Sequence, residues 1–163
     1  MERDEKDPYW RLRPELPTPE DEICHCSQSN AVILRDGLSK NPLFCANCNG
    51  EVPPERLGFD AKFAEEIANW LWLYDSLYCL WLNSGEYELW AKARLLDSVG
   101  QVNVQGRKIV EKLSTITRTY YWWFDDSEGE EERRLKICPI CTQTLEEYLN
   151  KNCRICEACR ILV

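Results

Sequence analysis

The sequence predicts an α+β fold in which two small cysteine-bearing β modules flank a helical middle segment and pack on it. Three observations support this prediction. Nine of the ten cysteines lie in two groups, within residues 24–48 and 138–159. Short β-branched and aromatic runs adjoin both groups, as is typical of strands. Between the groups, residues 59–118 repeat apolar side chains every three or four positions, which is the period of a helix. We expect residues 22–163 to form one globule.

Residues 1–22 are predicted to form an acidic, proline-rich arm. They carry four prolines, which interrupt helices and strands. We expect Tyr9 and Trp10 to hold part of this arm against the core. Residues 23–58 follow as the first β module. In it "AVIL" predicts a short strand, "RDG" and "KNP" predict turns, and "LFCANCNG" predicts a strand that ends in a tight turn.

The helical segment, residues 59–118, is predicted to contain three helices. The first starts from Phe59 with Asp60 as its N-cap and ends at "NSG". The second covers "EYELWAKARLLD". The third covers "GRKIVEKLSTIT" and places three aliphatic side chains on one side: Ile109, Leu113 and Ile116. Cys79 lies inside the first helix, and we interpret it as a small buried hydrophobic residue.

Residues 119–163 are predicted to form a β hairpin and the second cysteine-bearing module. The stretch "TRTYYWWF" favours a strand because it is rich in β-branched and aromatic residues. The acidic stretch "DDSEGEEE" predicts a solvated turn. The next stretch, "RRLKICPIC", is expected to return as a strand into the second group of cysteines.

The cysteine spacing in the first module indicates a metal site. Cys24-x-Cys26 and Cys45-x2-Cys48 can bring four sulfurs around one point. Zn²⁺ prefers this tetrahedral arrangement, with Zn–S distances of ~2.3 Å. We therefore expect a first structural zinc ion in a zinc-ribbon-like module. His25, the only histidine, is expected to be exposed between two ligands, and its replacement of one cysteine is the alternative.

A second zinc site is predicted around Cys138-x2-Cys141, and the spacing allows two ways to complete it. Pairing with Cys153 and Cys156 leaves a gap of 11 residues, whereas pairing with Cys156 and Cys159 leaves 14. Both gaps suit a zinc ribbon.

Rubredoxin-type iron is the alternative metal, although the CxC pair does not match it. A redox CxxC would need a βαβ context, which the sequence lacks. Disulfides would need export, and no signal for export is present.

Several stretches resemble an uncharacterised bacterial family of zinc-ribbon proteins for which nucleic-acid binding has been suggested. They are "NPLFCANCNGEVPPERL", "DSLYCLWLNSG", "QGRKIVEKL", "YYWW" and "CEACRILV". That family ends in CxxC followed by arginine and two aliphatic residues. The resemblance therefore implies that Cys156 and Cys159 complete the second zinc site and that Cys153 is a spare buried thiol. Members of the family carry a further N-terminal region that the arm here does not supply.

No enzymatic activity and no small-molecule substrate are expected. Four thiolates close a zinc site, whereas catalytic zinc keeps a position open for water. The sequence has one histidine and neither a P-loop nor a GxGxxG motif. It contains neither an apolar run that is long enough to span a membrane nor a secretory signal. We therefore expect a cytoplasmic protein without membrane association.

The charge favours a protein partner. The formal net charge is −8, and it becomes about −12 if eight thiolates hold two zinc ions. An acidic surface suits a basic protein through electrostatic complementarity, as in a regulatory or toxin-neutralising, immunity-like role. Trp72, Trp81 and Trp90 cannot all share one buried face, so one or two of them are expected to contact that partner.

Nucleic-acid binding is the alternative function. Residues 107–118 and 133–160 are rich in basic side chains, and the aromatic strand 120–124 lies between them in sequence. Basic residues beside aromatic rings can hold phosphates and stack bases. The candidate binding residues are Arg107, Lys108, Lys112, Arg118, Tyr121, Trp123, Arg133 and Arg134.

Overall fold

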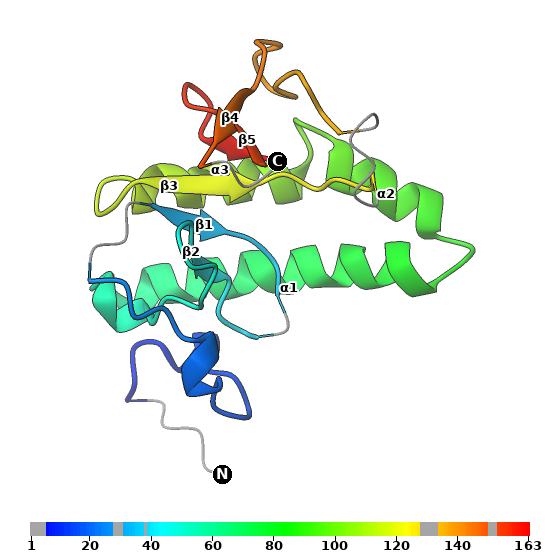
Figure 1. The fold of residues 1–163 in the computed structure, drawn as a ribbon. Coiled ribbons are helices and arrows are strands. Elements are labelled where there is room, and N and C mark those ends of the chain that lie inside the picture. Colours follow the sequence, from blue (N-terminus) through cyan, green and yellow to red (C-terminus); the bar gives the residue numbers. More distant parts are fainter. Residues whose placement is uncertain (1–5, 28–30, 38, 128–133, 150–152) are drawn as a thin grey trace.

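The computed structural model describes residues 6–27, 31–37, 39–127, 134–149 and 153–163. Its described part is mixed α+β, as predicted, with three α-helices and one six-stranded sheet in the order β2-β1-β3-β6-β5-β4 (Figure 1). The strands are short. Their bounds are Val32–Leu34 (β1), Leu43–Cys45 (β2), Thr119–Trp122 (β3), Glu146–Tyr148 (β4), Cys153–Cys156 (β5) and Ile161–Leu162 (β6).

Strand β3 joins the two cysteine-bearing ends into a single sheet. β1 pairs antiparallel with β2, and β4 and β6 pair antiparallel with β5. β3 lies between the two sets and runs parallel to both β1 and β6. A central strand has hydrogen-bonding groups along both edges, so it can pair on both sides. The two β modules are therefore parts of one sheet and not two separate units on either side of the helices.

The helices form the other layer. Helix α1 spans Ala61–Asn83, and the side chain of its N-cap Asp60 accepts a hydrogen bond from the Phe63 backbone N–H at 2.8 Å, as predicted. Helix α2 spans Glu88–Leu96, within the predicted second helix. Helix α3 spans Gln101–Leu113. The buried stripe of α1 consists of Ala64, Ile67, Ala68, Trp70, Leu71, Tyr74 and Leu77.

The predicted start of the third helix was wrong. α3 begins at Gln101, so Gly106 lies inside the helix and does not open it. A glycine is needed there because a Cβ would lie 2.4 Å from the Tyr121 ring and 2.9 Å from Nε1 of Trp70. Ile116 lies beyond the end of the helix and is exposed, so it does not continue the buried row of Ile109 and Leu113.

The sheet divides its side chains between two buried clusters. Successive residues of a strand point to opposite faces. Val32 of β1 and Tyr121 of β3 belong to the main core, which also contains the buried stripe of α1. Ile33 of β1 and Tyr120 of β3 belong to a smaller cluster without helical residues. We call the side of the sheet that carries this smaller cluster the helix-free face.

The N-terminal arm packs against α1 through a short 3₁₀ helix, Trp10–Leu12. Tyr9 is buried, and its hydroxyl donates a hydrogen bond to the Phe59 carbonyl oxygen at 2.8 Å. Leu12 is 1% exposed and joins the main core. The expectation that Tyr9 fixes this arm is confirmed.

Two local predictions were wrong. The segment "RRLKICPIC" forms no strand between residues 134 and 141, where the structure shows only an isolated bridge from Ile137 to Thr144. Cys79 is exposed and not buried, because it lies away from the stripe of α1 that contains Tyr74 and Leu77. Within the described residues, no helix is both long enough and apolar enough to span a membrane.

Candidate metal centres

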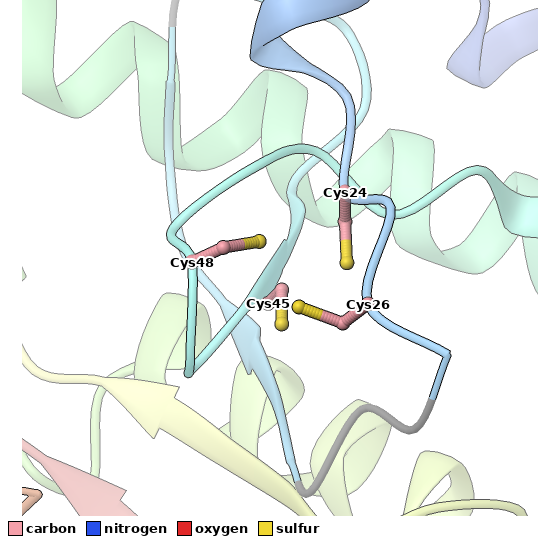
Figure 2. A group of neighbouring side chains, drawn as sticks. All are labelled: Cys24, Cys26, Cys45 and Cys48. Atoms are coloured by element: carbon pink, nitrogen blue, oxygen red, sulfur yellow. The ribbon is translucent and has the colours of Figure 1, made fainter.

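The first group of cysteines comes together from two segments. Cys45 ends β2, Cys48 lies in the turn that follows, and Cys24 and Cys26 lie on the segment that precedes β1. Figure 2 shows the four sulfurs converging on one point. All four sulfur atoms lie within 4.8 Å of one another. The structure thus assembles the four-cysteine cluster that the spacing predicted.

A tight turn presents Cys45 and Cys48 together. The Cys45 N–H donates to the Gly50 carbonyl at 2.8 Å, and the Asn49 N–H donates to the Cys45 carbonyl at 2.9 Å. Asn49 has a positive φ of 63°, a left-handed conformation that asparagine tolerates better than most residues. The Gly50 N–H also points at the Cys48 sulfur, 3.4 Å away. Such N–H contacts stabilise a thiolate.

The Cys24–Cys26 segment is held against this turn by backbone pairing. The Cys24 N–H donates to the Glu51 carbonyl at 2.8 Å, and the Glu51 N–H donates to the Glu22 carbonyl at the same distance. Gly50 is needed for this close approach, because a Cβ there would lie 2.8 Å from the Cys24 backbone nitrogen. The pairing fixes the distance between the two halves of the cluster.

Asn41 anchors the first cluster to the core, which sequence reasoning missed. Its fully buried side-chain amide donates to a Glu51 carboxylate oxygen at 3.1 Å and to the Val52 carbonyl at 2.9 Å. Its side-chain oxygen accepts the Leu43 N–H at 3.2 Å. These bonds tie the loop before β2 to the residues that follow the Cys45–Cys48 turn. The only sequence signal was the turn-forming "KNP".

The second cluster consists of Cys138, Cys141, Cys156 and Cys159, whose sulfurs also lie within 4.8 Å of one another. Its first turn repeats the hydrogen bonds of the Cys45–Cys48 turn. The Cys138 N–H donates to the Gln143 carbonyl at 2.8 Å, and the Thr142 N–H donates to the Cys138 carbonyl at 3.0 Å. Thr142 also has a φ of 63°.

The other half of the second cluster lies in the turn between β5 and β6. Cys156 ends β5 opposite Ile161 of β6, and Arg160, directly after Cys159, has a φ of 53°. All three CxxC turns therefore have a left-handed residue immediately after the second cysteine. The sulfurs of Cys141 and Cys156 lie 3.6 Å apart.

Cys153 lies outside the second cluster, and strand geometry explains why. Cys153 and Cys156 are the two ends of β5, and residues three apart on a strand point to opposite faces. Cys153 packs against the small cluster on the helix-free face, whereas Cys156 belongs to the main core. A CxxC spread along a strand cannot bring both sulfurs to one ion. Cys153 is half-buried and not fully buried.

His25 also stays outside the first cluster. It is exposed, and its Nε2 lies 2.9 Å from the Glu20 carbonyl oxygen. The expectation that His25 is exposed between two ligands is confirmed, and it is not part of the four-sulfur group.

Burial, neighbouring sulfurs and backbone N–H groups shift the pKa values of the clustered thiols. Hydrogen bonding with Cys48 raises the pKa of Cys26 to about 12, and burial raises the pKa of Cys24 and of Cys156. Cys141 is the exception, because the Gln143 backbone N–H lowers its pKa to about 7. A divalent cation would relieve this crowding, since bound thiolates are deprotonated.

Both clusters fit zinc in donor type and spacing. Sulfurs around a tetrahedral Zn²⁺ lie ~3.8 Å apart if each Zn–S distance is ~2.3 Å. The sulfur spacing in both clusters is compatible with that value. Four thiolates would fill every position of the ion, so the sites suit a structural metal better than a catalytic one.

The structure buries the two aromatic residues that were predicted to bind nucleic acid. Tyr121 and Trp123 are 0% and 1% exposed, so neither can stack a base; strand alternation turns them into the main core. Three basic residues of the group already have partners: Arg107 bonds the Ser98 carbonyl at 3.1 Å, Lys112 pairs with Glu66, and Arg118 pairs with Glu157.

Of the remaining basic residues, Lys108 is exposed on α3 and Arg134 is partly buried. Arg133 lies outside the described residues. The burial of Tyr121 and Trp123 removes the two aromatic rings from the predicted binding surface.

Comparisons with family models, curated proteins and solved structures found no match. The resemblance to a bacterial zinc-ribbon family therefore stays a prediction.

Proposed function

We propose that this protein is a non-catalytic scaffold whose two structural zinc ions stabilise the ends of one sheet and whose helices bind a basic protein partner. The zinc proposal rests on the two four-cysteine clusters. A closed thiolate site contributes its binding free energy to folding. Such a scaffold suits a regulatory or toxin-neutralising, immunity-like role in the cytoplasm, without enzymatic activity.

The observation that carries the partner proposal is the distribution of exposed apolar side chains. Seven of the eleven large hydrophobic residues that are exposed in the described part lie between residues 72 and 99. We call these seven the hairpin patch. They are Trp72, Leu82, Tyr87, Leu89, Trp90, Leu96 and Val99. A surface built from such apolar residues would be typical of a protein interaction site.

Helix α2 carries apolar side chains on two opposite sides. Ala91 and Leu95 are buried between α2 and the rest of the fold. Leu89, Ala93 and Leu96 have the spacing of one helical stripe and are all exposed. The turn between α1 and α2 lies at the right end of Figure 1, away from the strands that carry the cysteines.

Charge argues for a basic partner and against a second copy of this chain. The net charge is −8. Glu86 and Glu88 adjoin the hairpin patch and form no ion pair within the described residues. Two copies would bring like charges together, whereas a basic partner would neutralise them.

A charge introduced into the hairpin patch tests this proposal. A tagged protein would be used to capture partners from cell extract after nuclease treatment, and the captured protein would then be purified and its affinity measured. Leu89→Glu should weaken that purified complex at least about tenfold, as expected for a central apolar contact. The matched control is Leu16→Glu, at an exposed leucine on the N-terminal arm.

Three outcomes would contradict the proposal. The first is equal affinity of the Leu89 and Leu16 variants for the partner. The second is capture that disappears with nuclease, which would favour the nucleic-acid alternative. The third is a concentration-dependent dimer of the purified protein that Leu89→Glu dissociates, which would assign the hairpin patch to self-association.

A further inference from the structure

The helix-free face carries an arginine that forms no ion pair with any described carboxylate. Arg35 follows β1 and is half-buried. Within the described residues, no carboxylate oxygen lies within 4 Å of its guanidinium nitrogens. Its Nε is buried and has no hydrogen-bond acceptor. Partial burial of a charge is costly unless a partner compensates for it, so a bound anion would stabilise Arg35.

Two aromatic rings hold this guanidinium in place. Its central carbon lies 4.1 Å from the centre of the Phe44 ring and 5.9 Å from the centre of the Trp122 ring. Phe44 is on β2 and Trp122 is on β3, the two neighbours of β1. Rings stabilise a cation through the negative charge of their faces, but they accept no conventional hydrogen bond. The N–H donors along the edge of the guanidinium therefore remain to be satisfied.

The neighbouring carboxylate offsets this charge only in part. Asp36 follows Arg35 directly and attracts it but forms no ion pair with it, and the charge of Asp36 also bears on Tyr74 and Asp75 of α1. Burial raises the pKa of Asp36 and lowers the pKa of Arg35, and the attraction between the two groups opposes both shifts.

We propose that Arg35, held between Phe44 and Trp122 on the helix-free face, binds an oxyanion of a small ligand such as a phosphate or a carboxylate group. A guanidinium offers parallel N–H donors that match two oxygens of such a group. This site is separate from the hairpin patch, which lies on α1, α2 and the turns before and after α2, and it does not depend on the proposed protein partner.

Arg118 provides a matched control on the same strand system. It also lies over an aromatic ring, with its central carbon 5.5 Å from the centre of Tyr120. In contrast to Arg35, it is exposed and pairs with Glu157. If oxyanions merely collect at any arginine that rests on a ring, both residues should respond equally.

The experiment is a titration of the zinc-loaded full chain with inorganic phosphate, acetate and AMP, followed by the arginine Nε–H resonances in NMR. We expect the Arg35 resonance to shift with at least one probe. Arg35→Gln should weaken that binding about tenfold or more, the loss expected for hydrogen bonds to a charged group. Arg35→Lys should weaken the binding as well, because lysine lacks the parallel N–H donors of a guanidinium. Arg118→Gln should leave the binding unchanged.

The three probes also separate the sources of the oxyanion. Binding of phosphate but not of acetate would indicate that the ligand carries a phosphate group, and the reverse would indicate a carboxylate. Tighter binding of AMP than of phosphate would indicate a phosphate attached to a flat ring. Absence of any shift at Arg35 would overturn the proposal, and so would a binding constant that Arg35→Gln leaves unchanged. The wild-type shift keeps the test decisive if a variant fails to fold.

Discussion

The two cysteine clusters share their turn geometry but differ in what surrounds them. Around the first cluster, the residues of β1 and β2 are all buried, and the Asn41 side chain ties the neighbouring loops together. Around the second, Cys138 and Leu145 are the buried residues among the described positions 134–149. Hydrophobic contacts therefore support the first cluster, whereas the first half of the second has few of them.

A cluster of four cysteines can therefore serve two structural purposes. At the first cluster, a metal would reinforce a core that packing already holds. At the second, the metal would replace packing that residues 134–149 lack. The Ile137–Thr144 bridge closes the Cys138–Cys141 turn, and the β4–β5 pairing and a hydrogen bond from Arg154 to the Leu135 carbonyl connect this segment to the sheet.

The largest effect should come from breaking the first cluster. Cys45→Ser removes a ligand from a fully buried position at the end of β2, so we expect a global loss of about 3–5 kcal/mol in the free energy of unfolding. Cys138→Ser should instead increase hydrogen exchange within residues 134–149 and leave α1 and α3 protected. Chemical denaturation and hydrogen exchange would measure both.

Cys79→Ser is the control for these variants. Cys79 is exposed on α1, so its substitution should change the stability by less than about 0.5 kcal/mol. The comparison between the clusters fails if Cys138→Ser unfolds the whole protein as readily as Cys45→Ser does. It also fails if Cys79→Ser costs more than Cys45→Ser.

The next largest effect should distinguish the two cysteines that flank Cys156. Cys159→Ser should lose one zinc ion per chain and release the turn between β5 and β6. Cys153→Ser should keep both ions and nearly full stability, because the Cys153 side chain lies on the helix-free face. Metal analysis of the two purified variants makes the test. Loss of zinc from Cys153→Ser, with retention in Cys159→Ser, would reverse the assignment.

A substitution that changes no cysteine should have a smaller effect and should weaken only one of the two clusters. In Gly50→Ala, the new methyl group would lie 2.8 Å from the Cys24 backbone nitrogen, which cannot turn aside as a side chain can. We expect a cost of about 1–3 kcal/mol and weaker zinc retention at the first cluster alone. Competition with a chelator would report both sites. Equal weakening of the second cluster would show that the two sites are coupled through the sheet.

The sequence predicted the features that depend on local chemistry. Asp60 as a helix cap, the strand at "AVIL" and the cysteines of the first cluster each follow from residue type and spacing alone. For the second cluster the spacing left two solutions. The alternation along β5 excludes the combination of Cys153 with Cys156, but the position of that strand could not be fixed from its short pattern.

Features that depend on tertiary contacts were not predictable in the same way. The strand "TYYW" has aromatic residues in succession, so periodicity could not say whether Tyr121 or Tyr120 faces the helices. Cys79 was assigned to the core because a helix rich in apolar residues does not reveal how wide its buried stripe is. Gly106 looked like a helix start, whereas its neighbours Tyr121 and Trp70 come from distant parts of the chain.

Native mass spectrometry of the intact protein would show whether two four-thiolate zinc sites stabilise the two ends of one sheet. We expect a mass increase of two zinc ions per chain, with one ion lost from Cys45→Ser and the other from Cys159→Ser. A chain that is fully folded with one zinc ion, with none, or with iron in their place would contradict it.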